Sequence, residues 1–224
     1  MGSRCVCLFA VALVLGSVGQ AWAGVTFTDD FESGASVLWG NEIGAWGASG
    51  GVYSAANWSN FPSAHSSLPF DLTDFTIDFD VSNAYDGGVW LRSSSAEGTS
   101  VGRQGVLLVL APGGNLYWHI VPDGTSYGSS LNVTPLGSVT DLHFHVEVTG
   151  DTYEVFINGS DTAATTLTTD TFANGQAALY SNSRQSFDNV VLAVPDGDLP
   201  SVPVPGALLL AGLGAGLVRR FRPA

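Results

Sequence analysis

The feature that most constrains this chain is an alternation of apolar and polar residues with a period of two. Phe75 to Val81 alternates without a break, and so does Leu142 to Thr149. Because successive side chains of a strand point to opposite faces, this pattern predicts strands with one buried face. Residues 24–194 contain no convincing helical segment. We therefore expect one all-β domain.

Turn residues divide these strands into hairpins. Gly150-Asp151 separates residues 142–149 from 152–158, and two residues of this type suit a type I′ or II′ turn. A second hairpin is expected over residues 104–121 around Pro112-Gly113-Gly114-Asn115. About ten short strands packed in two layers predict a jelly-roll β-sandwich. The closing strands are expected at Ala177 to Ser181 and Phe187 to Val194.

The first 23 residues have the pattern of a secretory signal peptide. Arg4 gives a positive start, an apolar run follows, and Ala21-Trp22-Ala23 supplies small residues before the expected cleavage site. Cys5 and Cys7 both lie in this segment, so the mature protein would contain no cysteine and no disulfide bond. We expect an exported protein that begins with a removable signal helix.

The other end of the sequence has three parts in a fixed order. Val202-Pro203-Val204-Pro205 precedes a Leu-, Ala- and Gly-rich segment, and Arg219, Arg220 and Arg222 follow it. This arrangement resembles the PEP-CTERM sorting signal of Gram-negative bacteria that produce extracellular polysaccharide. The resemblance implies processing by an exosortase, transient inner-membrane anchoring through a short hydrophobic helix, and delivery to the cell surface or its matrix. The expected organisation is a signal peptide (1–23), a β-sandwich (24–194), a linker (195–201) and a sorting tail (202–224).

Charge narrows the choice of partners. The chain has no Lys, and four of its seven Arg lie in the two terminal segments, so three Arg oppose 20 acidic residues in the body. The resulting net charge of −17 repels nucleic acids and anionic lipid headgroups and attracts divalent cations. A nucleic-acid partner is therefore excluded.

The body resembles the concanavalin A-like and laminin G-like jelly-roll family. The segments that carry the likeness are Phe27 to Glu32, Gly88 to Ser93, His143 to Gly159 and Phe187 to Leu192. The resemblance implies that the first and last strands pair and that structural calcium lies near them. Carboxylate oxygens suit Ca²⁺, and the expected ligands are Asp30 and Asp188.

Carbohydrate binding requires aromatic surfaces together with hydrogen-bonding side chains. Aromatic rings are available at Trp46, Trp58, Trp90, Tyr117 and Trp118, and polar residues near them in the sequence are Asn57, Asn60, Arg92 and His119. Of these, the candidate glycan-binding residues are Trp90, Arg92, Tyr117 and His119. Trp118 alternates with Tyr117, so one of these two rings is expected in the core and the other outside. The alternative is that most of these aromatic residues fill the core of the sandwich.

His143 and His145 lie two residues apart on one strand face. With Glu147 and the cross-strand Glu154 they could form a zinc site. A polar, solvated strand surface explains the same residues, and we favour that interpretation.

No sequence motif indicates catalysis. Asp78 and Asp80 share one strand face, but the chain lacks the paired Glu of the laminarinase-type glucanases of this fold, the Gly-x-Ser-x-Gly elbow and the His-Glu-x-x-His helix. We expect a non-catalytic surface protein that binds extracellular polysaccharide or has a structural role in a biofilm. A secreted glycoside hydrolase that uses these two aspartates is the competing hypothesis, and a coat protein without a ligand is a third.

Overall fold

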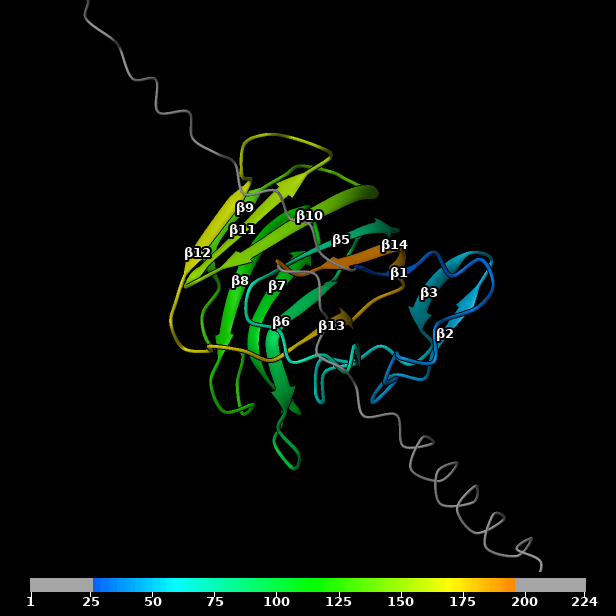
Figure 1. Cartoon of the computed structure of the whole chain (residues 1–224), viewed down its shortest axis with the longest axis horizontal. Coiled ribbons are helices and arrows are strands. Elements are labelled where there is room, and N and C mark those ends of the chain that lie inside the picture. Colours follow the sequence, from blue (N-terminus) through cyan, green and yellow to red (C-terminus); the bar gives the residue numbers. More distant parts are fainter. Residues whose placement is uncertain (1–25, 196–224) are drawn as a thin grey trace, which may run out of the picture.

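The computed structural model describes residues 26–195, which form fourteen strands in two antiparallel sheets packed face to face (Figure 1). This arrangement confirms the predicted all-β sandwich. The predicted signal peptide, the predicted sorting tail with its Arg cluster and nearly all of the predicted linker lie outside the described residues. Within residues 26–195 the backbone forms no helix, and hence none that is long and apolar enough to cross a membrane.

One sheet contains eight strands in the order β12-β11-β10-β5-β14-β3-β2, with β1 also paired to β14. The pairing of the first and last strands, which the family resemblance implied, is therefore present. Figure 1 shows β1 beside β14 and places β2 and β3 at the end of the sheet opposite β12. The strands are β1 (Thr26–Asp29), β2 (Trp46–Ser49), β3 (Val52–Ala55), β5 (Phe75–Ser82), β10 (Asp141–Thr149), β11 (Thr152–Ile157), β12 (Thr165–Thr168) and β14 (Ser186–Ala193).

The second sheet contains six strands in the order β4-β13-β6-β7-β8-β9. Both predicted hairpins are confirmed: β7 pairs with β8, and β10 pairs with β11 through a two-residue loop. In that loop Gly150 has a φ of 54° and Asp151 does not have a positive φ, which fits a type II′ turn. The strands are β4 (His65–Ser67), β6 (Gly87–Ser95), β7 (Arg103–Ala111), β8 (Asn115–Val121), β9 (Leu131–Pro135) and β13 (Gln176–Ser181).

The main hydrophobic core lies between the two sheets. Alternation along β10 buries Phe144, Val146 and Val148, as the sequence predicts, and the ring of Phe144 stacks on Phe79 of β5 with centroids 5.0 Å apart. Trp118 of β8 is fully buried here and donates a hydrogen bond from Nε1 to the Thr165 hydroxyl, 3.1 Å away.

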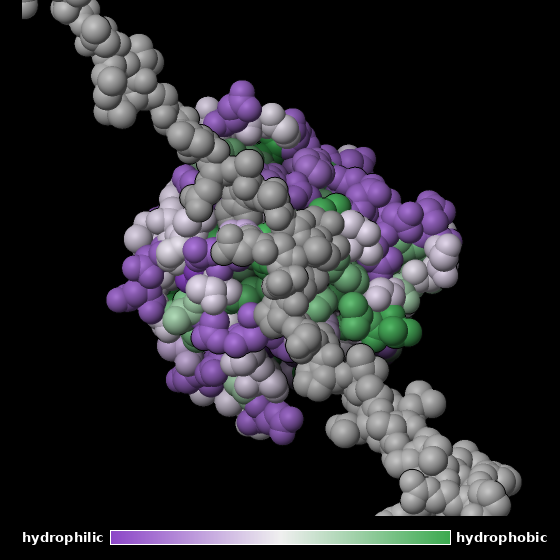
Figure 2. All heavy atoms as spheres, viewed as in Figure 1, coloured by the Kyte–Doolittle hydropathy of each residue, from purple (hydrophilic) through white to green (hydrophobic). Residues whose placement is uncertain are grey.

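A second, smaller cluster covers the other face of the six-stranded sheet. It contains Trp90 of β6, Leu107 and Val109 of β7, and Tyr180 of β13, with Tyr127 packed against them from a loop. This sheet is therefore buried on both faces over part of its area, which explains the continuously apolar sequence of β7. The view in Figure 2 is mainly hydrophilic, with hydrophobic residues gathered near the side where β2 and β3 lie.

Candidate functional site

A small pocket lies on the outer face of the six-stranded sheet, next to this second cluster. Its volume is about 80 Å³, which equals only two or three water molecules at about 30 Å³ each. It can therefore hold one edge or one substituent of a sugar and cannot enclose a whole ligand. Its lining combines apolar, aromatic and polar side chains: Asn60, Asp86, Leu107, Val109, Tyr117, His119, Tyr127 and Tyr180.

Strand alternation positions the floor of the pocket. Leu107 and Val109 lie two residues apart on β7, and Tyr117 and His119 lie two residues apart on β8, so each pair shares one face of its strand. The ring of Tyr117 meets the His119 ring edge to face, with centroids 5.2 Å apart. Trp118 points to the opposite face, into the main core. This confirms that one of the two neighbouring aromatic residues is in the core and the other is outside.

Two loops supply the polar rim of the pocket. Tyr127 donates a hydrogen bond from its hydroxyl to the Asn60 carbonyl oxygen, 2.9 Å away, and Tyr180 donates one to Asn60 Oδ1. These bonds fix the amide of Asn60. Among the residues that the structure describes, Asn60 Nδ2 has no hydrogen-bond acceptor, so it is left as a free donor at the rim.

Asp86 provides the only carboxylate among the described residues that line the pocket. Asn182 Nδ2 donates to Asp86 Oδ2 over 2.8 Å, and Oδ1 accepts no hydrogen bond from any residue in the described range. Burial raises the pKa of Asp86, and the hydrogen bond from Asn182 opposes that rise. Burial and the neighbouring Asp86 carboxylate both raise the pKa of Tyr117, so its hydroxyl is protonated and can donate. The rim therefore offers both donors and an acceptor.

His119 is neutral at physiological pH, because burial lowers its pKa. Its Nδ1 lies 3.3 Å from the Ser129 carbonyl oxygen. A carbonyl only accepts, so Nδ1 carries the proton and the imidazole is held in one orientation. Within residues 26–195, the lining consequently carries no positive charge to attract an acidic ligand.

Of the four predicted glycan-binding residues, the structure brings Tyr117 and His119 into the pocket and excludes the other two. Trp90 is fully buried beneath Tyr127, with ring centroids 6.2 Å apart, and donates from Nε1 to the Ser63 hydroxyl. Its ring belongs to the second hydrophobic cluster. The expectation that Trp90 contacts a ligand directly is corrected by this burial.

Arg92 is likewise enclosed, with 2% of its surface exposed. Its guanidinium donates to the Thr73 and Phe172 carbonyl oxygens and to the Asp74 carboxylate, and it lies 5.4 Å from the centroid of the Tyr153 ring. These groups belong to the other sheet and to its connecting loops. Arg92 therefore joins the two layers of the sandwich and has no free donor face for a glycan.

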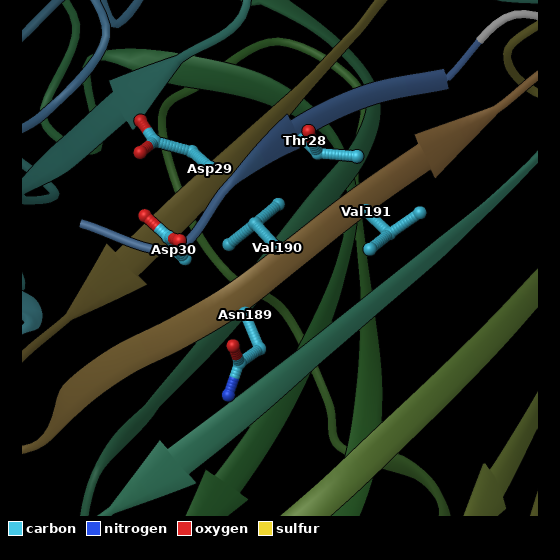
Figure 3. A pocket seen from close by; sticks show the side chains of 6 residues that line it. All are labelled: Thr28, Asp29, Asp30, Asn189, Val190 and Val191. Carbon is cyan, nitrogen blue, oxygen red and sulfur yellow. The ribbon is translucent and has the colours of Figure 1, made fainter. Parts of the chain in front are cut away.

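The calcium ligands expected from the sequence lie near the β1–β14 pair. A shallow depression there has a volume of about 290 Å³ and is lined by Asp30 and Asn189, whereas Asp188 is absent from its lining. In Figure 3 the carboxylates of Asp29 and Asp30 lie at the end of β1, and the Asn189 amide points away from them. Asn189 Nδ2 in fact donates to Asp80 on β5.

The neighbouring Asp29 is occupied within the fold. Its carboxylate accepts hydrogen bonds from the backbone N–H of Phe31 and Ser36 and from Trp39 Nε1. Residues 26–195 contain no group of three or more His, Cys, Asp or Glu that could hold a metal ion. Ca²⁺ prefers six to eight oxygens, so the donor set around Asp30 and Asp188 does not fit it as it stands. Calcium binding stays a prediction, to be checked by the melting temperature with added Ca²⁺ and with EDTA.

The two strand histidines pair with carboxylates. Nδ1 of His143 lies 2.7 Å from Asp80, and the two nitrogens of His145 lie 2.7 Å from Asp78 and 3.0 Å from Glu147. The predicted cross-strand position of Glu154 opposite Glu147 is confirmed. Hydrogen bonding to Asp78 raises the pKa of His145 to about 9. Each of these histidines is thus paired with carboxylates along one strand surface, so a polar strand surface accounts for these residues.

Besides Leu107 and Val109 of the apolar floor, three lining residues were not named as candidates from the sequence: Asp86, Tyr127 and Tyr180. Asp86 is part of a turn, and acidic turn residues are common in any β protein. The Ser- and Gly-rich segment around Tyr127 gives no periodic signal. Tyr180 alternates with core residues of β13, but alternation cannot distinguish a covered outer face from the main core.

No protein-family profile and no curated protein sequence matches this chain. Solved structures similar in fold include the carbohydrate-binding module CBM66 from Bacillus subtilis, at 16% identity over 69% of this chain and 86% of that one, with a TM-score of 0.44. The exoplasmic/lumenal domain of VIP36, in a form with Ca²⁺ and Man3GlcNAc, aligns at 12% identity over 74% and 86%, with a TM-score of 0.46. A protein provisionally described as a glycosyl hydrolase, from Parabacteroides distasonis, aligns at 14% identity over 68% and 84%, with a TM-score of 0.47. At such identities the likeness concerns the fold alone.

Proposed function

We propose that this domain is a non-catalytic carbohydrate-binding module that acts outside the cell. The observation that supports this most directly is the pocket itself, in which the amide of Asn60 and the carboxylate of Asp86 face an aromatic and apolar floor. Sugars combine hydroxyl groups, which need donors and acceptors, with apolar C–H faces that pack on aromatic rings. A small, partly open pocket with this lining suits one edge of a sugar ring.

The ligand is an uncharged glycan. The lining contains one carboxylate and a neutral imidazole, and the body of the chain carries a net charge of −17. Placing a uronic acid or sulfated sugar there would bring two negative charges together in a partly buried site, which is unfavourable. Neutral hydroxyl-rich polymers avoid this repulsion.

Substitution of Asp86 tests the proposal. Asp86→Asn keeps the shape and can keep the bond from Asn182, but it removes the charged acceptor. We expect the affinity for a neutral glycan to fall about 10- to 100-fold, as measured by calorimetry or glycan array. Glu97→Gln, at an exposed turn position, is the matched control and should leave the affinity unchanged. If no neutral glycan binds to the folded domain, the coat-protein hypothesis is favoured instead.

The hydrolase hypothesis is tested in the same samples. Asp78 and Asp80 lie on the eight-stranded sheet, away from the pocket lining, and each is hydrogen-bonded to a histidine. We expect no release of reducing sugar from any glycan that binds. Turnover that disappears in both Asp78→Asn and Asp80→Asn would establish the hydrolase instead.

Export and surface sorting complete the proposal and rest on the sequence. The pattern before Ala23 supports removal of a signal peptide, and Val202-Pro203-Val204-Pro205 followed by an apolar segment and Arg219, Arg220 and Arg222 supports processing by an exosortase. Mass spectrometry of the mature protein tests both steps. The expected product begins at Gly24 and ends near the Val-Pro-Val-Pro motif, and retention of either end contradicts the corresponding step.

A further inference from the structure

Exposed aromatic residues are concentrated beside the pocket. The large hydrophobic residues left exposed in the described range are Val37, Trp58, Phe61, Tyr85 and Val133. All three aromatic members of this set lie within two positions, along the chain, of the two polar rim residues. Trp58 and Phe61 flank Asn60, and Tyr85 precedes Asp86. Exposed apolar surface gathered in one place marks a binding surface.

The loop that carries Trp58 and Phe61 is fixed to the pocket wall. The Ser59 N–H donates to the Ser181 carbonyl oxygen over 3.3 Å, directly after the pocket residue Tyr180. On the other side of Asn60, the ring of Phe61 meets that of Tyr127 edge to face, with centroids 5.4 Å apart. The loop is thus held to the residue that follows Tyr180, and the Phe61 ring packs on a residue that lines the pocket.

These rings are held in place and still remain open to solvent. The Arg184 guanidinium carbon lies 5.9 Å from the centroid of the Trp58 ring, which supports that ring from one side. Trp58 is 43% exposed and Phe61 is 60% exposed. A rigid ring that is fixed before binding loses little conformational entropy when a ligand stacks on it.

We propose that Trp58 and Phe61 stack on sugar units next to the one in the pocket, so that the ligand is a segment of a polysaccharide several units long. This inference rests on the proposed carbohydrate function. The pocket of about 80 Å³ is too small to supply much affinity alone. Flanking aromatic surfaces supply additional contact area without additional charge, and they extend the site along a polymer.

The experiment is calorimetry with a length series of neutral oligosaccharides. Cello-, laminari-, malto-, xylo- and manno-oligosaccharides of one to six units are used as probes. For the series that binds, we expect the affinity to rise about tenfold or more between two and five units, since each stacking contact adds roughly 3- to 10-fold. Trp58→Ala and Phe61→Ala should each remove about that factor for the long oligosaccharides and leave the short ones unaffected.

The variants separate the claim of an extended aromatic site from the claim of a sugar-binding pocket. Val37→Ala, at an exposed hydrophobic position in another loop, is the control and should bind all lengths like the parent protein. Equal affinity for all lengths, or unchanged binding by the two aromatic variants, would overturn the extended site while leaving the pocket intact. Loss of binding at every length in Asp86→Asn supports the pocket independently. Failure of every probe to bind the folded parent protein would reject both claims.

Discussion

His65 and His145 lie in different sheets, and their surroundings move the two pKa values in opposite directions. His65 on β4 is buried, and burial lowers its pKa to about 4. His145 on β10 is half-exposed, and its hydrogen bond to Asp78 raises its pKa to about 9. The unfolded chain titrates both near 6.5, so folding releases a proton from one group and stabilises the proton on the other.

This opposition predicts a stability maximum near pH 6.5. Below it, the unfolded chain binds a proton at His65 that the folded protein does not, so stability falls between pH 6.5 and 4, by about 2 kcal/mol from this group. Above it, the folded protein keeps the His145 proton longer, so stability falls between pH 6.5 and 9, by about 1 kcal/mol because water screens a half-exposed pair. Urea unfolding at a series of pH values measures the acidic and the alkaline decline in the free energy of unfolding.

One variant separates the contributions of the two histidines. His145→Gln should remove the alkaline decline and leave the acidic one, and a variant that kept the alkaline decline would show that another group causes it.

Arg92, like Trp90, is a residue to which sequence and structure assign different roles. It is buried and bonded to the Thr73 carbonyl and the Asp74 carboxylate. Arg92→Lys cannot reproduce these fixed bonds, so we expect a loss of about 3 kcal/mol in unfolding free energy. The exposed Arg184→Lys should cost less than about 0.5 kcal/mol. If Arg92→Lys left the stability unchanged and weakened glycan binding, Arg92 would have to be assigned to the binding site.

Among single residues, the sequence identifies the pocket residues that lie on β8. Tyr117 and His119 were predictable because alternation with the core residue Trp118 places them on the opposite face of β8. Asn60 was named only as one of several polar residues near aromatic ones, and Asp86 could not be chosen among the many loop Asp residues. Their role depends on contacts with residues over 90 positions away, such as the bonds from Tyr180 to Asn60 and from Asn182 to Asp86.

Among the elements, strand length decides what could be predicted. The long strands β5 and β10, and both hairpins, follow from period-two patterns over eight or nine residues. β2, β3, β4, β9 and β12 contain three to five residues each and were not predicted individually. Such short strands form because neighbouring strands pair with them, and three to five residues are too few to show a clear period-two pattern in the sequence.

The close approach of β6 to β7 requires a glycine at position 88. A Cβ at Gly88 would lie 2.0 Å from the Leu108 carbonyl oxygen, and backbone cannot move aside as a side chain can. We expect Gly88→Ala to cost about 3 kcal/mol or more in unfolding free energy, by analogy with overpacked cores. Gly47→Ala on β2 is the control, since nothing lies within 4 Å of its added Cβ. Equal stability of the two variants would show that this close approach is unimportant.

For the whole molecule, charge is the property that the sequence predicts most completely. Three Arg against 20 acids leave repulsion over the entire surface. Raising NaCl from 10 to 300 mM shortens the screening length several-fold, so we expect about 1 kcal/mol of stabilisation and a melting temperature about 3 °C higher. Choline chloride at the same concentrations should stabilise the protein to the same extent as NaCl. A rise confined to a divalent salt would indicate a specific cation site, and a flat response would contradict the repulsion.

The antiparallel pairing of β1 with β14 sets Thr26 directly opposite Ala193. The start of the first strand and the end of the last strand therefore lie one strand spacing apart. A linker of a few glycines would join them without disturbing either sheet. New ends could then be opened at the exposed Gly150-Asp151 turn, which would give a circularly permuted chain with the same register. The architecture of this sandwich is thus close to a closed ring, and the order in which the chain visits its strands can change while the ligand-facing loops remain in place.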